Sequence, residues 1–207
     1  MARGALKLQQ ILKPVIRVLF RILSRIRVVG LENLPSRPPY IVFSNHISWF
    51  DPFLVGSWVP APVYFMTMEG LLKFPPLGLL LRCVGAFPVS RGSLDRSAIE
   101  NSTNILESGG VVFIFPEGGI GRLRKGEKLR PGISLIAQRT NVPLVPVDIS
   151  GCRGLYHPLK LLTRRVSIEI RIGVPFPITS VSDLAGKKMR QMVMDRITRE
   201  MYSLARE

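Results

Sequence analysis

The stretch YIVFSNHISWFDP, residues 40–52, decides how this chain folds. Tyr40–Ser44 is a short apolar run, typical of a strand that is buried within a sheet. Asp51 can cap a helix, and Pro52 falls in the first helical turn, where proline is tolerated. The stretch therefore predicts a buried strand, a turn and then a helix.

The same alternation continues along the chain. Further strands are predicted over Val111–Phe115, Val142–Ile149 and Val166–Ile172. Strands separated by helices predict an α/β fold, a single layered domain with a largely parallel central sheet flanked by helices. The later helices are predicted from Ser93 or Asp95 to about Ser108, over Gly132–Thr140 and over Ser182–Glu207.

Composition narrows the class of protein. The chain has 207 residues and carries 29 Lys and Arg against 14 Asp and Glu, yet 46% of it is hydrophobic. Length fits one domain, and the apolar content excludes a disordered basic tail. Aromatic residues make up only 8%, whereas nucleic-acid modules interleave aromatic with basic residues. We therefore expect an anionic membrane surface as a partner, and no nucleic acid.

The two cysteines, Cys83 and Cys152, lie far apart and lack metal-type spacing. They predict neither a disulfide framework nor a metal site, and they indicate a reducing compartment.

Residues 1–29 are predicted to be a membrane-association segment, followed by one folded domain over residues 30–207. Apolar residues between Ala5 and Val29 recur mostly at helical spacing, with a start or kink expected at Pro14. Each Lys or Arg at the centre of a bilayer costs roughly 2.5–3.5 kcal/mol, which argues against a membrane span. We expect a helix in the membrane interface, its apolar face in lipid and its arginines on head groups. The cationic residues form one stripe, because they fall every four residues, at Lys13, Arg17, Arg21 and Arg25.

Other interpretations of this segment are an amphipathic helix packed on the protein's own core, or a cleaved presequence, since no acidic residue precedes Glu32. A second apolar stretch, Gly70–Arg82, is too short to span a membrane. It either packs as a buried helix or forms a second surface that faces lipid or an acyl chain.

Polar residues follow the first predicted strand, and active sites of such sheets gather at the carboxyl ends of the strands. His46 comes directly after this strand region, and Asp51 follows five residues later. A turn between them can place the carboxylate on one ring nitrogen, which leaves the other free to take a proton from a substrate hydroxyl. The alternative is a capping aspartate beside an unrelated histidine.

The second predicted strand ends in FPEGGIGR, residues 115–122. A glycine-rich bend after a strand lets backbone N–H groups approach an oxyanion or phosphate. Glu117 can accept a hydrogen bond from a substrate hydroxyl, hold the loop from inside or lie in solvent. A Walker phosphate loop and a Gly-x-Ser-x-Gly elbow are both absent from the sequence. Direct transfer by a histidine base, without a covalent enzyme intermediate, is therefore favoured.

Together these segments resemble the glycerolipid acyltransferases of the 1-acylglycerol-3-phosphate acyltransferase type. One block is Asn-His-x-Ser-x-x-Asp at residues 45–51, and another is Phe-Pro-Glu-Gly at residues 115–118. GAFPVSRG at residues 85–92 resembles the family block that ends in a substrate-binding arginine, and VPLVPV at residues 142–147 resembles its last block. All four occur in the family's order.

The resemblance implies an enzyme of phospholipid biosynthesis that moves a fatty acyl group from acyl-CoA or acyl carrier protein to the free hydroxyl of a lysophospholipid. The expected acceptor is 1-acylglycerol-3-phosphate and the product phosphatidate. His46 is implied as the general base, Asp51 as its holder and Arg91 as the phosphate-binding arginine. No cofactor or metal is expected, and the enzyme is expected at the cytoplasmic face of the membrane, peripheral or monotopic. The implied substrate-binding residues are Arg91, Glu117, Gly118, Gly119, Arg122, Asn45 and Ser48.

Two departures from the family pattern concern the acceptor's head group. Gly119 and Ile120 stand where the family typically has Thr-Arg, and Thr67 stands where it commonly has a lysine. Arg122, Arg124 or Lys125 can substitute for these cations. The alternatives are an acyltransferase for a different lyso-lipid, or a catalytically degenerate basic protein that binds lipid or nucleic acid.

Overall fold

The structure is a computed structural model that describes residues 3–89, 95–122, 128–153, 166–178 and 186–205. Arg91, Arg124 and Lys125 lie outside these ranges, as do Ser93 and Ser182, the residues expected to begin two of the helices. No helix within the described ranges has the length and apolar character needed to cross a membrane.

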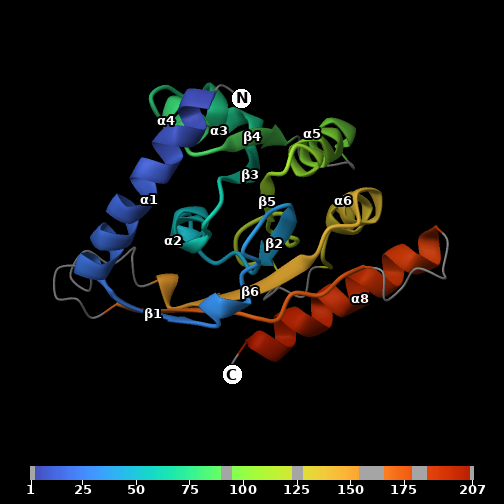
Figure 1. Ribbon diagram of the computed structural model, residues 1–207. Coiled ribbons are helices and arrows are strands. Elements are labelled where there is room, and N and C mark those ends of the chain that lie inside the picture. Colours follow the sequence, from blue (N-terminus) through green and yellow to red (C-terminus); the bar gives the residue numbers. More distant parts are fainter. Residues whose placement is uncertain (1–2, 90–94, 123–127, 154–165, 179–185, 206–207) are drawn as a thin grey trace.

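A seven-stranded sheet runs through the described part of the chain, in the order β1-β7-β6-β2-β5-β3-β4 (Figure 1). Neighbouring strands are parallel except β6 and β7, which are antiparallel. The predicted α/β fold with a largely parallel sheet is confirmed. The strands are β1 (Arg25–Val29), β2 (Tyr40–Ser44), β3 (Val63–Met68), β4 (Ala86–Val89), β5 (Val111–Ile114), β6 (Leu144–Ser150) and β7 (Ser167–Ile172).

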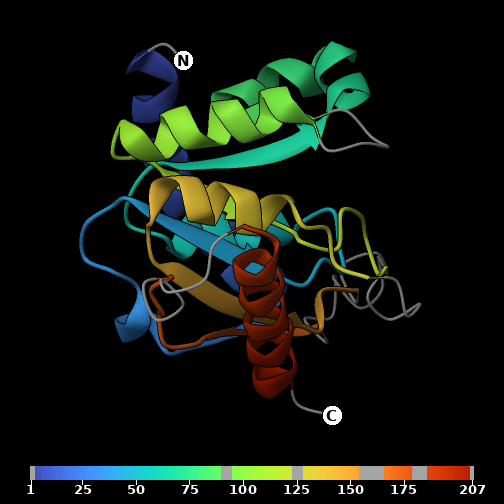
Figure 2. The ribbon, with the colours of Figure 1, turned by 90° about the vertical axis from the view of Figure 1, so that its right-hand side faces the viewer.

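Helices cover both faces of the sheet (Figures 1 and 2). One face carries α1 (Arg3–Leu23), α2 (Asp51–Trp58), α3 (Glu69–Lys73) and α4 (Leu77–Cys83). The other carries α5 (Arg96–Glu107), α6 (Gly132–Thr140) and α8 (Lys187–Leu204), which lie in front of the sheet in Figure 2. A short 3-10 helix, η1 (Leu31–Asn33), follows β1.

Strand β2 lies between β6 and β5, and its alternating side chains supply two separate cores. Tyr40 and Val42 pack on the side of α2, whereas Ile41 and Phe43 pack on the side of α5 and α6. Burial on both faces explains why this strand is an unbroken apolar run rather than an alternating one.

Three strands were not anticipated: β1, β3 and β4. β3 directly follows Pro60 and Pro62, and β4 contains Pro88, so both segments lacked a strand-like pattern. β4 tolerates its proline because it is an edge strand of the sheet. Proline has no backbone N–H, and on the outer side of an edge strand no neighbouring strand needs that donor.

The N-terminal helix is shorter than the expected basic segment. α1 passes through Pro14 as one helix and ends at Leu23, where Ser24 Oγ donates to the carbonyl of Phe20 at 2.6 Å. Residues 25–29, expected to continue the segment, form β1 instead and pair with β7.

The side of α1 that meets the domain carries buried polar residues as well as apolar ones. Lys13 is buried, and its Nζ donates to the carbonyls of Val59 and Ala61 at 2.8 and 2.5 Å. Arg17 and Arg21 place their guanidinium groups over the ring of Trp58 on α2, at 5.5 and 5.1 Å from its centre. Lys13, predicted to belong to one cationic stripe with the arginines, is therefore internal, because its ammonium satisfies carbonyl groups of the protein.

Candidate active site

The carboxyl ends of β2 and β5 lie side by side, because the two strands pair in parallel with Phe43 opposite Ile114. The residues that follow them therefore meet at one edge of the sheet. The ring of His46 stacks on that of Phe115, with centres 4.0 Å apart and planes 17° from parallel. This edge is where the sequence predicted the site.

His46 and Asp51 are in contact. His46 Nδ1 lies 2.9 Å from Asp51 Oδ2, and the Asp51 side chain is fully buried. The same oxygen accepts hydrogen bonds from the backbone N–H groups of Ile47 and Ser48, at 2.7 and 2.8 Å. These bonds close the turn and hold the carboxylate against the ring, so the proton of a neutral His46 stays on Nδ1 and Nε2 is the basic nitrogen.

The sequence suggested that Asp51 caps helix α2, and this expectation is wrong. Asp51 is the first residue of the helix, and its carboxylate turns back to the preceding loop. The reason is that Ile47 and Ser48 offer two N–H donors on the side where His46 lies.

The second carboxylate oxygen, Oδ1 of Asp51, is buried and has no hydrogen-bond partner at ordinary distance within the described residues. The thiol of Cys152, also fully buried, interacts with this carboxylate. Burial, and next the Asp51 charge, raise the pKa of Cys152 well above its usual range, so the thiol stays protonated beside the carboxylate. No role was predicted for Cys152 from the sequence. Its position just after β6 was the feature that could have indicated a place near the site.

Asn45 and Ser48, predicted to bind substrate, are bonded to the protein's own backbone. The Asn45 amide donates to the carbonyl of Ile149 and accepts from its N–H, both at 2.8 Å, which ties the end of β2 to β6. Ser48 is buried, and its Oγ accepts from the N–H of Phe50 at 3.2 Å. Both residues shape the turn that carries His46, and a direct contact of either with substrate stays a prediction.

Glu117 holds the backbone of His46. Its side chain is buried, and Oε1 accepts from the N–H of His46 at 2.8 Å. The carbonyl of His46 in turn accepts from the N–H of Gly121 at 2.6 Å. Of the three interpretations that the sequence left open for Glu117, the internal support of the loop is the one that this geometry matches.

A cavity of about 530 Å³ opens beside His46. Its walls are mostly apolar and come from β3, α3, α5, β5 and α6, including Met66, Leu71, Ile99, Ile114, Ile133 and Ile136. His46, Trp49, Gly118, Gly119 and Arg130 line it as well. The cavity therefore places an apolar chamber next to a basic nitrogen and a cation.

Gly118 and Gly119 give arginine side chains room at this cavity. Gly118 has a φ of +66°, and a Cβ built on it would lie 2.7 Å from Nε of Arg130. A Cβ on Gly119 would lie 2.9 Å from Cδ of Arg122. Gly118 N–H donates to the carbonyl of Phe115 at 3.0 Å, so this glycine serves the shape of the loop.

Arg130 is a candidate binding residue that the sequence analysis did not name. Its backbone N–H donates to the carbonyl of Pro116 at 2.7 Å, which anchors it beside the glycine-rich loop. The side chain is exposed and has no ion-pair partner among the residues that the structure describes. The sequence analysis named Arg122, Arg124 or Lys125 as substitute cations and did not include Arg130, which directly precedes Pro131 and helix α6.

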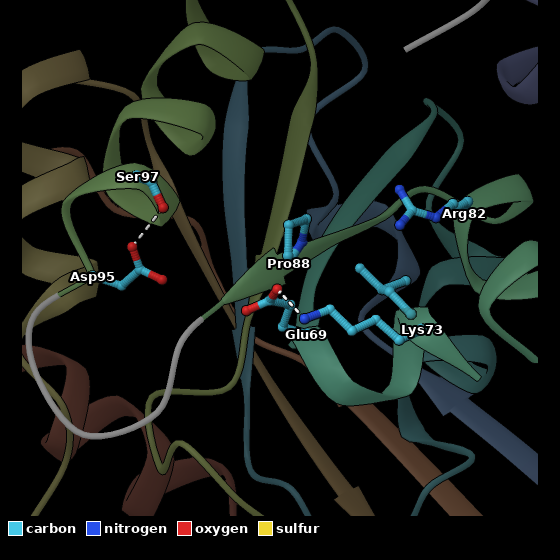
Figure 3. Close-up of a pocket in the computed structure, with 7 residues that line it drawn as sticks. Glu69, Lys73, Arg82, Pro88, Asp95 and Ser97 are labelled. Carbon is cyan, nitrogen blue, oxygen red and sulfur yellow. Dashed lines mark hydrogen bonds and ion pairs between the residues drawn. The ribbon is translucent and has the colours of Figure 1, made fainter.

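A second, smaller cavity of about 280 Å³ lies at the end of β4 (Figure 3). Figure 3 shows Lys73 and Arg82 on one side of it and Asp95 and Ser97 on the other. Glu69 pairs with Lys73 at 2.7 Å, and Ser97 Oγ donates to Asp95 at 2.6 Å. Asp95 also lines the large cavity, so the two spaces adjoin. Across the described ranges, no group of three or more His, Cys, Asp or Glu side chains is placed to hold a metal ion.

A histidine in contact with a buried carboxylate, at the carboxyl edge of a largely parallel sheet and beside an apolar chamber, is an arrangement suited to an enzyme that activates a hydroxyl group. The family model described as Acyltransferase matches residues 25–150. The chain belongs to the acyltransferase family. It is an O-acyltransferase of the 1-acylglycerol-3-phosphate acyltransferase type, and the predicted family is confirmed.

Similar proteins carry this activity in their names. The chain is 25% identical to the 1-acyl-sn-glycerol-3-phosphate acyltransferase of Bacillus subtilis, over 91% of this chain and 92% of that one. It is 29% identical to the enzyme of the same name from Saccharomyces cerevisiae, over 87% of this chain and 62% of that one. The crystal structure of the 1-acyl-sn-glycerophosphate acyltransferase PlsC from Thermotoga maritima superposes with a TM-score of 0.66 and 24% identity, covering 98% of this chain and 81% of that chain. That likeness shows the same fold.

Proposed function

We propose that this acyltransferase moves a fatty acyl group from an acyl-CoA or acyl-carrier-protein thioester to the free hydroxyl of 1-acylglycerol-3-phosphate, which forms phosphatidate. The observation that carries the proposal is the contact of His46 Nδ1 with buried Asp51, beside the apolar cavity. The names of the similar proteins support the choice of acceptor.

In the proposed mechanism, His46 Nε2 takes the proton of the acceptor hydroxyl as its oxygen attacks the thioester carbonyl carbon. The resulting tetrahedral intermediate collapses, the carbon–sulfur bond breaks, and the leaving thiolate receives the proton from His46. Asp51 stabilises the imidazolium that exists between the two proton transfers, and Glu117 keeps the His46 backbone in place. The reaction needs no cofactor besides the thioester co-substrate.

Arg130 is proposed to bind the acceptor's phosphate, together with Arg122 and with Arg91, which lies outside the described residues. An exposed guanidinium at the mouth of the cavity can form two parallel hydrogen bonds to a phosphate group. This arrangement would replace the cation that the family typically has directly after Phe-Pro-Glu-Gly. The acyl chain is proposed to occupy the apolar part of the cavity, where it is removed from water.

The substrates place the enzyme at a membrane. We propose that it acts at the cytoplasmic face as a peripheral or monotopic protein of phospholipid biosynthesis, held by the outward apolar face of α1. Exposed Ile11, Val15 and Ile22 on that face, with a formal chain charge of +15, suit an anionic lipid surface.

The test is acyl transfer from radiolabelled acyl-CoA, and separately from acyl carrier protein, to a panel of lyso-lipids, read by thin-layer chromatography. We expect phosphatidate from wild type, and a rate at least about 100-fold lower from His46→Ala with an unchanged thermal melt, the scale of a lost general base.

Product from another lyso-lipid alone would reject phosphatidate formation and assign the two departures near Thr67 and Gly119 to a changed head-group site. No product from either donor would reject the activity, and a fully active His46→Ala would reject the mechanism.

A further inference from the structure

The outer side of α1 is apolar. Ile11 is 65% exposed, Val15 57% and Ile22 59%, whereas Gln9 and Lys13 on the inner side are at most 6% exposed. The inner side is apolar as well, because Phe20 is buried in the core and Leu12 and Ile16 pack against it. A surface helix of a protein surrounded by water keeps its outer face polar. Contiguous exposed apolar area of this kind marks an interaction surface.

The orientation of α1 is set by specific bonds. Gln9 Nε2 donates to the carbonyls of Val63 and Val84, each at 2.6 Å, and Gln9 Oε1 accepts from the N–H of Val63 at 2.9 Å. Lys13 satisfies two further carbonyls. Rotating the helix to bury its outer face would leave these buried polar groups without hydrogen-bond partners, which is unfavourable.

A second exposed apolar group lies on α3 and α4. Phe74 is 64% exposed, Leu79 69% and Leu80 50%, while Leu72 and Leu81 from the same segment are buried in the core. The segment is thus half anchored and half exposed, which combines the two interpretations that the sequence left open for Gly70–Arg82.

The two apolar groups adjoin. Val84, whose carbonyl receives a hydrogen bond from Gln9, is the residue directly after α4. Figure 1 shows the N-terminal turns of α1 beside α3 and α4. The exposed apolar residues of both groups form one apolar surface: Leu8, Ile11, Val15, Val18, Leu19, Ile22, Phe74, Leu77, Leu79 and Leu80.

The charges around this surface are mostly positive. Lys7 on α1 and Arg82 on α4 are exposed. No acidic residue precedes Glu32 in the sequence, and Glu69 of α3 is paired with Lys73. An apolar patch with a cationic rim is complementary to the interface of an anionic bilayer, with hydrocarbon beneath phosphate groups.

We infer that α4 and Phe74 form a second membrane-inserting element, which together with the outer face of α1 seats the enzyme on an anionic phospholipid bilayer. Leu71 of α3, three residues before Phe74, lines the large cavity, so insertion of this element would bring one wall of the cavity close to the lipid surface. This link to substrate entry rests on the proposed function, whereas the membrane contact itself does not.

The test compares two double variants of the full chain by co-sedimentation with phosphatidylglycerol–phosphatidylcholine vesicles. Phe74→Ser with Leu79→Ser removes the two most exposed apolar side chains of this element. Val174→Ser with Tyr202→Ser is the matched control, since these side chains are 71% and 60% exposed. Tyr202 lies on α8, and Val174 follows Gly173, which packs against Leu204 of α8.

We expect the first variant to bind vesicles at least tenfold more weakly than wild type and the control to bind like wild type, with equal thermal melts. Wild type is expected to bind pure phosphatidylcholine vesicles more weakly. Wild-type binding by the first variant, or an equal loss in the control, would overturn the inference. So would a concentration-dependent dimer in sedimentation velocity that the first variant abolishes while its vesicle binding is unchanged.

A kinetic arm separates this inference from the proposed function. The first variant is expected to acylate a short-chain, water-soluble lysophosphatidate at the wild-type rate and a vesicle-borne long-chain one at least tenfold more slowly. Equal loss with both acceptors would overturn the link to substrate entry. If no lyso-lipid is acylated at all, the proposed function fails, and vesicle binding by wild type and by His46→Ala still decides the membrane contact.

Discussion

The backbone N–H of His46 donates a hydrogen bond to Oε1 of Glu117, at 2.8 Å, across the ends of two neighbouring strands. The proposed base and the glycine-rich loop are therefore one unit, although 71 positions separate the two residues in sequence. In this bond Glu117 has a structural role, which requires an acceptor oxygen at a fixed position.

A glutamine at position 117 should retain much of the activity. Glu117→Gln keeps an oxygen that can accept from the His46 N–H, whereas Glu117→Ala removes it. Loss of a hydrogen bond to a charged group costs about 1.5–3 kcal/mol. We therefore expect kcat about tenfold or more lower in Glu117→Ala and only a few-fold lower in Glu117→Gln, measured by steady-state acyl transfer. Equal, severe losses in both variants would point instead to chemistry that needs the charge.

Arg130 should control the affinity for the acceptor. Arg130→Ala removes the exposed guanidinium at the cavity, and a charge-assisted hydrogen bond contributes about 1.5–3 kcal/mol. We expect the KM for lysophosphatidate to rise roughly 10- to 100-fold while the KM for the acyl donor stays unchanged. Arg139→Ala is the control, since Arg139 is an exposed arginine in the last turn of α6, the helix that follows Arg130. A donor KM that rises instead would assign Arg130 to the donor.

Lys13 should make the stability of the fold depend on pH. Burial, and next the charge of Arg17, lower the pKa of Lys13 from 10.5 to about 8. Between these values the unfolded chain binds more protons than the folded chain, so the free energy of unfolding rises with pH from about 8 to 10.5. The rise attributable to Lys13 is at most about 3 kcal/mol.

Urea unfolding of wild type and Lys13→Met at pH 7.5 and pH 10 measures this effect. Wild type should gain stability relative to the variant as the pH is raised, because the variant lacks the titrating group. Parallel pH dependences of the two proteins would show that the ammonium is not desolvated in the native state.

The two cysteines should react very differently with an alkylating reagent. The pKa of Cys152 is raised by burial and by the Asp51 carboxylate, and only a thiolate reacts readily. Cys83, by contrast, is partly exposed at the end of α4. We expect iodoacetamide at pH 8 to modify Cys83 alone in the native protein and both cysteines in urea, as read by mass spectrometry. Modification of native Cys152 at the rate of Cys83 would mean that the buried position of Cys152 beside Asp51 is readily accessible to the reagent.

Several elements of the fold could be predicted from local sequence patterns. The apolar run Tyr40–Ser44 and the helix Gly132–Thr140 have the predicted bounds, because both are bounded by turn residues. The family resemblance was also readable from four ordered blocks, and the pairing of His46 with Asp51 needed only a five-residue turn. Such features depend on residues close together in sequence.

The sequence by itself determined the α/β class, the family and the pairing of His46 with Asp51, since each depends on short-range spacing. Tertiary structure alone decided that Glu117 supports His46, that Arg130 lies at the cavity and that α1 buries Lys13 while exposing Ile11. The pattern of α1 shows two faces but not which one meets the protein. That choice is made by carbonyl groups at Val59, Ala61, Val63 and Val84, which come together only when the sheet has formed and which need donors that water cannot supply there.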